Sequence, residues 1–283
     1  MGSKNPAAVF LDRKENGMKN LRKSRPRLIL HILMMLCAVG ILCSAFVLFS
    51  DNREYAKGDA AYQQLRLIGE SSEPSTDQAS IPLQTVGEAS SEEMQEEHIN
   101  GVDFTSLERI NPDVVGWLAA EGTEIDYPVV QGKDNDFYLR HLFTGERNKL
   151  GSIFMDFRNH SDFSGKNTII YGHNLKDGSM FSSLKKYKDQ RYYDSFPTML
   201  LYTPTGNYTI ELFAGIVVDG NYESVRFDFK DDHDFQSYVD SIKKKSTFES
   251  DTIVSGDDQI ITLCTCSYEF DNARYALYGK LTK

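Results

Sequence analysis

The sequence of 283 residues predicts a mostly β domain with flanking helices, preceded by an N-terminal transmembrane helix. Three observations predict this arrangement. An uncharged apolar run follows a basic N-terminus, an acidic segment comes next, and residues 103–283 hold about eight short runs that are rich in β-branched and apolar residues. Runs of this number, separated by Gly, Asn and Asp turns, suit a closed barrel or a sandwich.

The N-terminus predicts a membrane anchor. Residues 1–27 carry eight Lys or Arg and two acids, a net charge of +6, and residues 28–49 contain no Asp, Glu, Lys or Arg. At a rise of about 1.5 Å per residue this run reaches roughly 33 Å, enough to cross a hydrocarbon core of about 30 Å. The basic tail should stay in the cytoplasm, with the rest of the chain outside. A cleavable signal peptide is the alternative, although its apolar region is usually shorter.

The exterior part of the chain is acidic. Subtracting the +6 of the tail from the overall −10 leaves −16 for residues 28–283. Nucleic-acid binding draws on Lys and Arg to neutralise phosphates, so this charge argues against it. The composition predicts neutral or basic partners and no nucleic acid.

Residues 50–102 are expected to form an extracellular stalk and a linker. Residues 51–67 are polar and partly helical in pattern, whereas residues 70–100 hold many acids, no Lys or Arg and no aromatic residue. Such a composition cannot bury enough apolar surface to order itself, which predicts a flexible spacer. A regulatory lid is the functional alternative.

The folded domain is expected to open with a helix. Phe104, Leu107 and Ile110 have helical spacing, and Asn111 followed by Pro112 predicts a second helical turn. Trp117 is expected to be a core residue. Six predicted strands follow, at Gly116–Ala120, Glu124–Val130, Ser152–Phe157, Thr168–Tyr171, Thr198–Tyr202 and Tyr208–Val218.

Two insertions between these strands have helical patterns. Residues 179–187 place Phe181 and Leu184 on one face. Residues 231–245 repeat apolar positions at helical spacing, with acids at the start and three lysines at the end, which complements the helix dipole. The lysines could instead bind an anionic polymer, but a solvated helix end is the favoured interpretation.

The last two predicted strands hold the most informative residues. Gln259–Cys266 and Ala273–Leu281 show strand patterns, and the polar residues between them suit a turn. Cys266 and Arg274 should then face each other across neighbouring strands. A guanidinium beside a cysteine can favour the thiolate, or stabilise an oxyanion formed by attack on a carbonyl.

A proton carrier is also needed, and His173 is the best candidate. It lies where the apolar run Thr168–Tyr171 ends in a Gly-containing loop, and histidine titrates near neutral pH. Taken singly, a buried core cysteine, a structural histidine and a solvated arginine are the ordinary interpretations.

The exterior cysteines are Cys264 and Cys266. Two residues apart on a strand, they should point to the same face, where a bridge closing so short a ring would be strained. Two free thiols are therefore expected.

Together these residues resemble a known family. Thr262-Leu263-Cys264-Thr265-Cys266, followed by Arg274 and preceded by Tyr171-Gly172-His173-Asn174, resembles the TLxTC signature of sortases, the membrane-anchored cysteine transpeptidases of Gram-positive bacteria. Asp113–Leu118 and Ile125–Gln131 resemble the early strands of class B sortases. The resemblance runs from about residue 104 to the C-terminus and implies an eight-stranded sortase-type β-barrel over residues 103–283, with a helix before the last two strands.

The resemblance also implies a reaction. Cys266 would attack the carbonyl of a Thr in a sorting signal near the C-terminus of a secreted protein and form a thioacyl intermediate. His173 would protonate the departing amine and then accept a proton from the incoming one, a peptidoglycan cross-bridge or a pilin lysine. Arg274 would hold the substrate and its oxyanion.

Further site residues follow only from family position. Asn135 and Leu139 would line the groove for the sorting signal, and Cys264 and Thr265 would flank the nucleophile; many class B members have Ser where this chain has Cys264. Neither a cofactor nor a metal is implied, because the exterior histidines show no ligand spacing with Cys or acids. A Cys-His peptidase of the cell wall and an inert membrane-tethered binding module are the alternatives.

Overall fold

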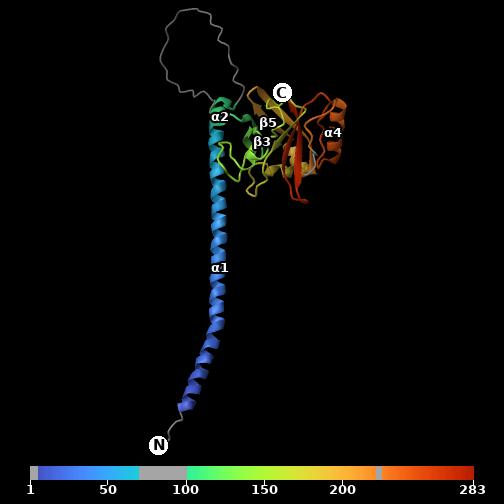
Figure 1. The fold of residues 1–283 in the computed structure, drawn as a ribbon. Coiled ribbons are helices and arrows are strands. Elements are labelled where there is room, and N and C mark those ends of the chain that lie inside the picture. Colours follow the sequence, from blue (N-terminus) through green and yellow to red (C-terminus); the bar gives the residue numbers. More distant parts are fainter. Residues whose placement is uncertain (1–5, 70–100, 221–224) are drawn as a thin grey trace, which may run out of the picture. The chain divides into compact units, whose positions relative to one another are not determined.

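The computed structural model describes residues 6–69, 101–220 and 225–283, with side chains from residue 30 onward (Figure 1). The described chain divides into two compact units, residues 1–53 and 54–283. Its helices are α1 (Pro6–Gly69), α2 (Phe104–Ile110), η1 (Phe137–Leu139), η2 (Ser182–Lys188), α3 (Gln190–Ser195) and α4 (Asp232–Lys245). Its strands are β1 (Val114–Ala119), β2 (Asp126–Val130), β3 (Ile153–Met155), β4 (Asn167–Tyr171), β5 (Thr198–Thr203), β6 (Gly206–Asp219), β7 (Ile260–Cys266) and β8 (Ala273–Thr282).

The first unit consists of helix α1 up to residue 53. Within the described residues one helical stretch, Leu30–Gly69, is long and apolar enough to cross a membrane. The large apolar side chains between residues 30 and 49 are exposed, as expected of a segment that has lipid rather than protein as its surroundings.

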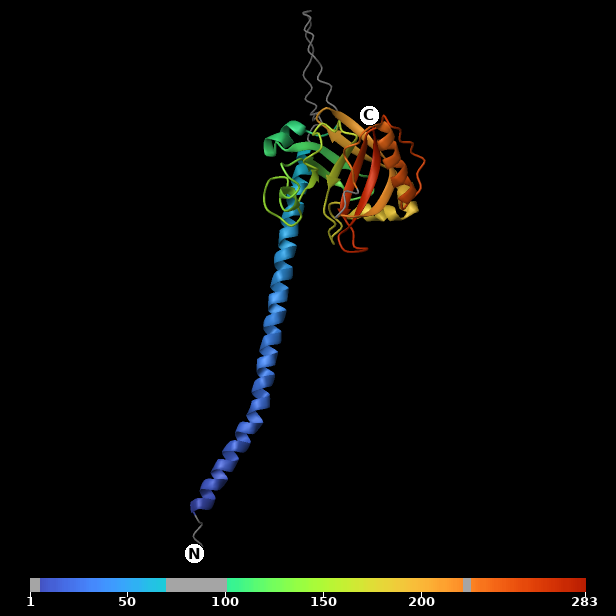
Figure 2. The ribbon, with the colours of Figure 1, turned by 45° about the vertical axis from the view of Figure 1, so that its right-hand side comes forward.

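The eight strands form a closed barrel in the order β1-β2-β3-β4-β7-β8-β6-β5. Each strand predicted from the sequence overlaps one of them, so the β-barrel prediction is confirmed. Two neighbouring pairs are parallel, β2 with β3 and β4 with β7, and the others are antiparallel. The long strands β6 and β8 lie side by side over ten paired positions (Figure 2).

The parallel pairing of β4 with β7 places the carboxyl ends of these two strands at the same edge of the barrel. Tyr171, the last residue of β4, pairs with Cys264 near the end of β7. Strand β8 starts at this edge and β6 ends there, because Ala273 pairs with Asp219. Four strand ends therefore meet at one rim.

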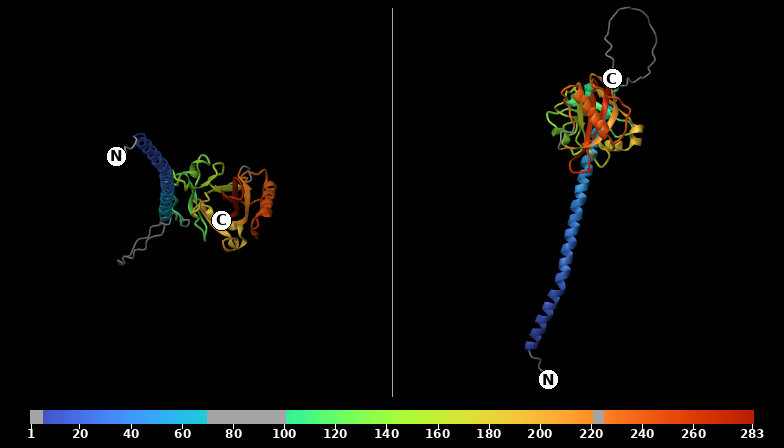
Figure 3. Two further views of the ribbon diagram at one scale, coloured as in Figure 1. Left: turned by 90° about the horizontal axis from the view of Figure 1, so that it is seen from below. Right: turned by 90° about the vertical axis from the view of Figure 1, so that its right-hand side faces the viewer.

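Two apolar clusters hold the second unit together. One fills the barrel and includes Leu263 of β7 and Leu277 of β8. The other lies between the outer face of the barrel and helix α4, and includes Ala276 and Tyr278 of β8. The period of two therefore sorts β8 into inward and outward residues. Helix α4 lies on the opposite side of the barrel from residues 54–69 of α1 (Figures 1 and 3).

Helix α4 follows the sequence pattern closely. Asp231 caps its N-terminus, since the carboxylate accepts a hydrogen bond from the backbone N–H of Asp234. The last turn holds three lysines, and the four predicted apolar residues are buried: Phe235, Tyr238, Val239 and Ile242. The predicted helix is confirmed.

The prediction of a second helical turn at Asn111 and Pro112 was wrong. Asn111 is instead the C-cap of α2, in an extended conformation, and its backbone N–H donates to the carbonyl of Leu107. A residue before proline is pushed out of the helical region by the proline ring, which explains why α2 ends here. Strand β1 begins two residues after Pro112.

The predicted helix at residues 179–187 is the 3₁₀ helix η2, which starts three residues later. The hydroxyl of Ser182 accepts from the backbone N–H of Leu175 and donates to the carbonyl of Ser179. Residues 179–181 therefore form a turn ahead of η2 rather than its first residues. Phe181 and Leu184 are fully buried, as their spacing predicted.

Residues 51–67 were expected to form a stalk, but most of this segment packs against the barrel. Helix α1 continues through this segment, and Tyr62 and Leu65 are only 2% and 3% exposed, packed in the core of the barrel unit. Residues 54–69 therefore belong to the folded unit. The spacer predicted for residues 70–100 lies outside the described residues.

The close packing of β6 and β8 gives a test of the fold. A Cβ added at Gly279 would overlap Cγ2 of Ile210, so Gly279→Ala should lower the free energy of unfolding by about 1–3 kcal/mol. Gly165→Ala is the control, because a Cβ there meets no atom within 4 Å. Urea titration of the detergent-solubilised chain measures both, and equal midpoints for the two variants would contradict the packing of β6 on β8.

Candidate active site

Cys266 and Arg274 are direct partners across the antiparallel strands β7 and β8. Both side chains are half-buried at the rim of the barrel. Residues opposite each other in such a pair point to the same face, with Cβ atoms about 4.5–5.5 Å apart. The arrangement predicted from the strand pattern is therefore confirmed.

The backbone around Arg274 holds its guanidinium in place. Nη1 donates to the carbonyl oxygens of Asn272 and Ala273, at 3.3 and 3.1 Å. Gly220, after β6, lies so close that a Cβ there would be 3.2 Å from Cγ of Arg274. None of the ion pairs among the described residues involves this guanidinium.

His173 lies at the same rim, two residues after the end of β4. Its Nε2 is 2.7 Å from the carbonyl oxygen of Leu139. Because a carbonyl oxygen only accepts, Nε2 carries the hydrogen of this bond and Nδ1 is the nitrogen left to exchange a proton. The backbone carbonyl of His173 accepts from the N–H of Phe181 at 2.9 Å, which fixes the start of the following loop.

Three hydrogen bonds, one between backbone groups and two from side chains, continue the pairing of β4 with β7 on both sides of His173 and as far as Cys266. The N–H of Gly172 donates to the carbonyl of Cys264 at 3.2 Å, and the hydroxyl of Thr265 donates to the carbonyl of Gly172 at 2.8 Å. The amide of Asn174 then donates to the carbonyl of Cys266 at 2.8 Å. This last contact was not predicted; the one available signal was that Asn174 directly follows the candidate histidine.

Cys264 is a buried thiol behind the rim. It is 5% exposed, and burial raises its pKa to about 12 although the charge of Arg274 opposes this shift. Cys264 and Cys266 are both free cysteines, as expected. Thr265 is also buried, and its hydroxyl is engaged with Gly172.

Asn135 belongs to a polar cluster centred on the buried carboxylate of Asp156. Its amide nitrogen donates to Asp156 Oδ2 and its amide oxygen accepts from the N–H of Phe157, both at 3.1 Å. The guanidinium of Arg158 donates twice to the same carboxylate, the backbone N–H of Arg158 donates once, and Tyr171 donates once. Burial alone would raise the pKa of Asp156, but the bonds from Arg158 and Asn135 leave it below its usual range.

Leu139 lies next to the candidate histidine. Its carbonyl holds His173, and its half-buried side chain packs against the barrel core. The structure thus brings Leu139 to the rim directly, whereas Asn135 is connected to it through Asp156 and Tyr171.

The loop between Cys266 and Arg274 is fixed from outside by Lys188 of η2. The ammonium of Lys188 pairs with Glu269 and lies 3.2 Å from the hydroxyl of Ser267, which donates to Glu269 in turn. Hydrogen bonds from Lys188 and then from Ser267 lower the pKa of Glu269 to about 2. This cluster was not predicted from the sequence, because Lys188 lies 79 residues before Ser267 and 81 before Glu269.

The rim therefore combines a thiol, a guanidinium and an imidazole. This set can attack an acyl carbon, stabilise the resulting oxyanion and exchange a proton with an amine. In the described part of the chain no group of three or more His, Cys, Asp or Glu is arranged to hold a metal ion.

Comparisons with known proteins agree with this chemistry. Residues 118–282 match the family described as the sortase domain. A sortase B of Listeria monocytogenes is 43% identical over 181 residues, covering 63% of this chain and 74% of the relative.

Two solved structures share the fold. A Bacillus anthracis protein described as similar to sortase B is 34% identical with a TM-score of 0.67, covering 81% of this chain and 97% of that one. A Staphylococcus aureus sortase B, solved as a substrate complex, is 39% identical with a TM-score of 0.61, covering 64% and 84%. The family match spans more than half of the sequence and includes every element of the rim, so this chain belongs to the sortase B family of cysteine transpeptidases.

Proposed function

We propose that this sortase B cleaves a C-terminal sorting signal of secreted proteins at a Thr carbonyl and transfers the acyl group to an amine. The observation that carries the proposal is the cross-strand pairing of Cys266 with Arg274, at the rim where His173 follows the end of the parallel neighbour β4. The Staphylococcus aureus relative solved as a substrate complex supports the presence of a substrate-binding site in this chain.

Cys266 is the nucleophile in the first step. Its thiolate attacks the Thr carbonyl carbon, and the oxyanion of the tetrahedral intermediate lies against the guanidinium of Arg274. As the C–N bond breaks, the imidazolium of His173 gives a proton to the departing amine. A thioester to Cys266 and a neutral imidazole remain.

The second step reverses these roles. An amine attacks the thioester carbonyl, His173 takes a proton from the amine, and the C–S bond breaks to return the Cys266 thiolate. The product is a new amide bond, so no external energy source is consumed. The acceptor is an amine of a peptidoglycan cross-bridge or the side chain of a pilin lysine.

The groove for the sorting signal is proposed to include Asn135, Leu139, Cys264 and Thr265. Leu139 has the strongest support, because its carbonyl contacts His173. The buried side chains of Cys264 and Thr265 favour contact with substrate through backbone groups. Asn135 would act by keeping the Asp156 cluster in place beside Tyr171.

The location of the enzyme is also a proposal. The basic tail and the apolar part of α1 support a single-pass anchor with the N-terminus in the cytoplasm and the catalytic unit outside. An extracellular catalytic unit would meet both secreted proteins and wall precursors there.

One experiment tests the reaction as a whole. The chain is incubated with a library of sorting-signal peptides and candidate amines, and mass spectrometry follows the thioacyl adduct and the products. Transfer to an amine at the Thr carbonyl is expected. Hydrolysis that persists with amines in large excess would instead indicate a cell-wall peptidase.

The two neighbouring cysteines should behave differently. Cys266→Ala should abolish the thioacyl adduct, whereas Cys264→Ser should stay within about threefold of the parent rate, because only one sulfur attacks. Iodoacetamide should alkylate Cys266 and spare Cys264, whose pKa is raised to about 12 by burial. Loss of the adduct in Cys264→Ser would show that the nucleophile is misassigned.

Arg274 should not tolerate replacement by lysine. We expect Arg274→Lys to lower kcat about 100-fold, since one ammonium cannot reproduce the planar donors that face an oxyanion. Arg191→Lys is the matched control, because Arg191 is exposed and pairs with Asp189 away from the rim. Steady-state transpeptidation measures both variants, and near-parental rates for Arg274→Lys would exclude its proposed role.

The proposed topology predicts the outcome of surface proteolysis. Protease added to intact wall-less cells should release a soluble fragment that contains Cys266, while a cytoplasmic marker protein stays whole. If the fragment stays protected although a known exterior protein is digested, the proposed orientation is wrong.

A further inference from the structure

One face of α1 is docked on the segment that lies behind His173. Glu54, Gly58 and Tyr62 are spaced by four residues, so they share a face of the helix. The Glu54 carboxylate accepts from the N–H of Lys149 at 2.9 Å, and its carbonyl accepts from the amide of Asn148. At Gly58 the helix comes so close that a Cβ would lie 2.6 Å from Leu150.

Tyr62 makes the deepest of these contacts. Its hydroxyl donates to the carbonyl of Gly151 at 2.7 Å and lies 3.0 Å from the hydroxyl of Ser152. The ring packs edge-on against Tyr127, with centroids 5.2 Å apart. Burial raises the pKa of Tyr62, so the hydroxyl keeps its proton and acts as a donor.

Gly151 in turn forms part of the surface against which the imidazole of His173 packs. Its φ of +64° is in the left-handed region, and a Cβ there would lie 3.0 Å from Cδ2 of His173 and 2.9 Å from the carbonyl of Leu139. That carbonyl is the acceptor for Nε2 of His173. The ring is thus confined between Gly151 and Leu139, and Tyr62 holds Gly151 from the other side.

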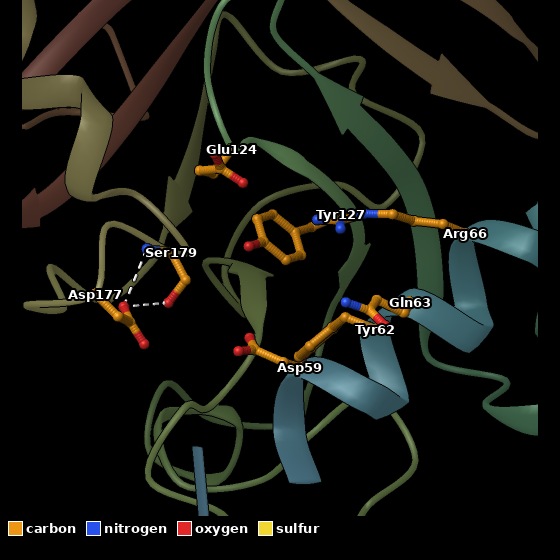
Figure 4. A pocket seen from close by; sticks show the side chains of 8 residues that line it. All are labelled: Asp59, Tyr62, Gln63, Arg66, Glu124, Tyr127, Asp177 and Ser179. Atoms are coloured by element: carbon orange, nitrogen blue, oxygen red, sulfur yellow. Dashed lines mark hydrogen bonds between the residues drawn. The ribbon is translucent and has the colours of Figure 1, made fainter. Parts of the chain in front are cut away.

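A pocket of about 180 Å³ lies beside this contact, between α1 and the loop that follows His173 (Figure 4). Asp59 and Asp177 line it from the two sides, and Ser179 donates to Asp177. Burial, and then the charge of Asp177, raise the pKa of Asp59, so these two groups repel rather than bind. The contacts of Tyr62 with Gly151, and of Gly151 with the imidazole, therefore connect α1 to His173.

We propose that Tyr62 is a positioning residue for His173. Its hydroxyl fixes Gly151, Gly151 and Leu139 confine the imidazole, and Nε2 stays engaged so that Nδ1 exchanges the proton. The Tyr62 hydroxyl would then support the proton transfer of the transpeptidase. The inference rests on the proposed role of His173 as proton carrier.

The test uses the full chain in detergent micelles and the variant Tyr62→Phe, which removes one hydroxyl. Loss of one neutral hydrogen bond should lower kcat about fivefold, with the KM for the sorting peptide nearly unchanged. The NMR signal of the His173 Nε2–H should broaden through faster exchange with water. If Tyr62 had only a structural role, the variant would show neither a selective loss of kcat nor a broader His173 signal.

Two controls keep the outcome specific. Tyr193→Phe loses a similar bond, from a buried hydroxyl to Ser250 at 2.7 Å, and should retain parental kinetics and the His173 signal. Glu54→Gln loosens the same docking face without touching Gly151, and should also leave both readouts unchanged.

Each other result overturns the inference. One such result is that Tyr62→Phe matches the two controls, and the other is that all three variants lose kcat in proportion to their thermal stability. Failure of the proposed function is a separate outcome: His173→Ala would then keep the parental rate, or Cys266→Ala would still form the adduct.

Discussion

The parallel pairing of β4 with β7 is the constraint on which the site depends. Parallel neighbours end at the same edge of a sheet, so this pairing brings the residues after Tyr171 beside the end of β7. Three contacts beyond the regular ladder, made by Gly172, Thr265 and Asn174, carry the alignment to the rim. The antiparallel return of β8 then places Arg274 opposite Cys266. A slip of one residue in either pairing would turn one member of the set to the other face of the barrel.

The cationic side chains near the rim have two kinds of partner. Arg158 is paired with the buried carboxylate of Asp156, and Lys188 is paired with Glu269. Arg274, in contrast, is held by backbone carbonyls, which orient a guanidinium without neutralising its charge. Burial raises the pKa of the Cys264 thiol, so this sulfur keeps its proton. Among the described residues, two cations near the rim thus stand in ion pairs with carboxylates, and the guanidinium of Arg274 is held by backbone carbonyls.

The barrel and the facing pair could be predicted from the sequence because both depend on a period of two. Every predicted strand was found, and Cys266 faces Arg274. Contacts between segments far apart in the chain carry no such pattern. The bond from His173 to Leu139, and the pair of Lys188 with Glu269, depend on where loops meet. The extra helical turn at Asn111 was a local error, since the proline that follows forces an extended residue.

The docked end of α1 was missed for a different reason, which concerns the kind of face a helix can bury. A hydrophobic stripe is recognised by large apolar side chains at helical spacing. The face of α1 that meets residues 148–152 instead uses a carboxylate at Glu54, no side chain at Gly58 and a phenol at Tyr62. Glycine weakens an isolated helix, so a glycine in the sequence does not suggest a helix face that packs against the domain. Here its missing side chain allows the helix backbone to reach Leu150, and that close approach brings the Tyr62 hydroxyl within bonding distance of Gly151.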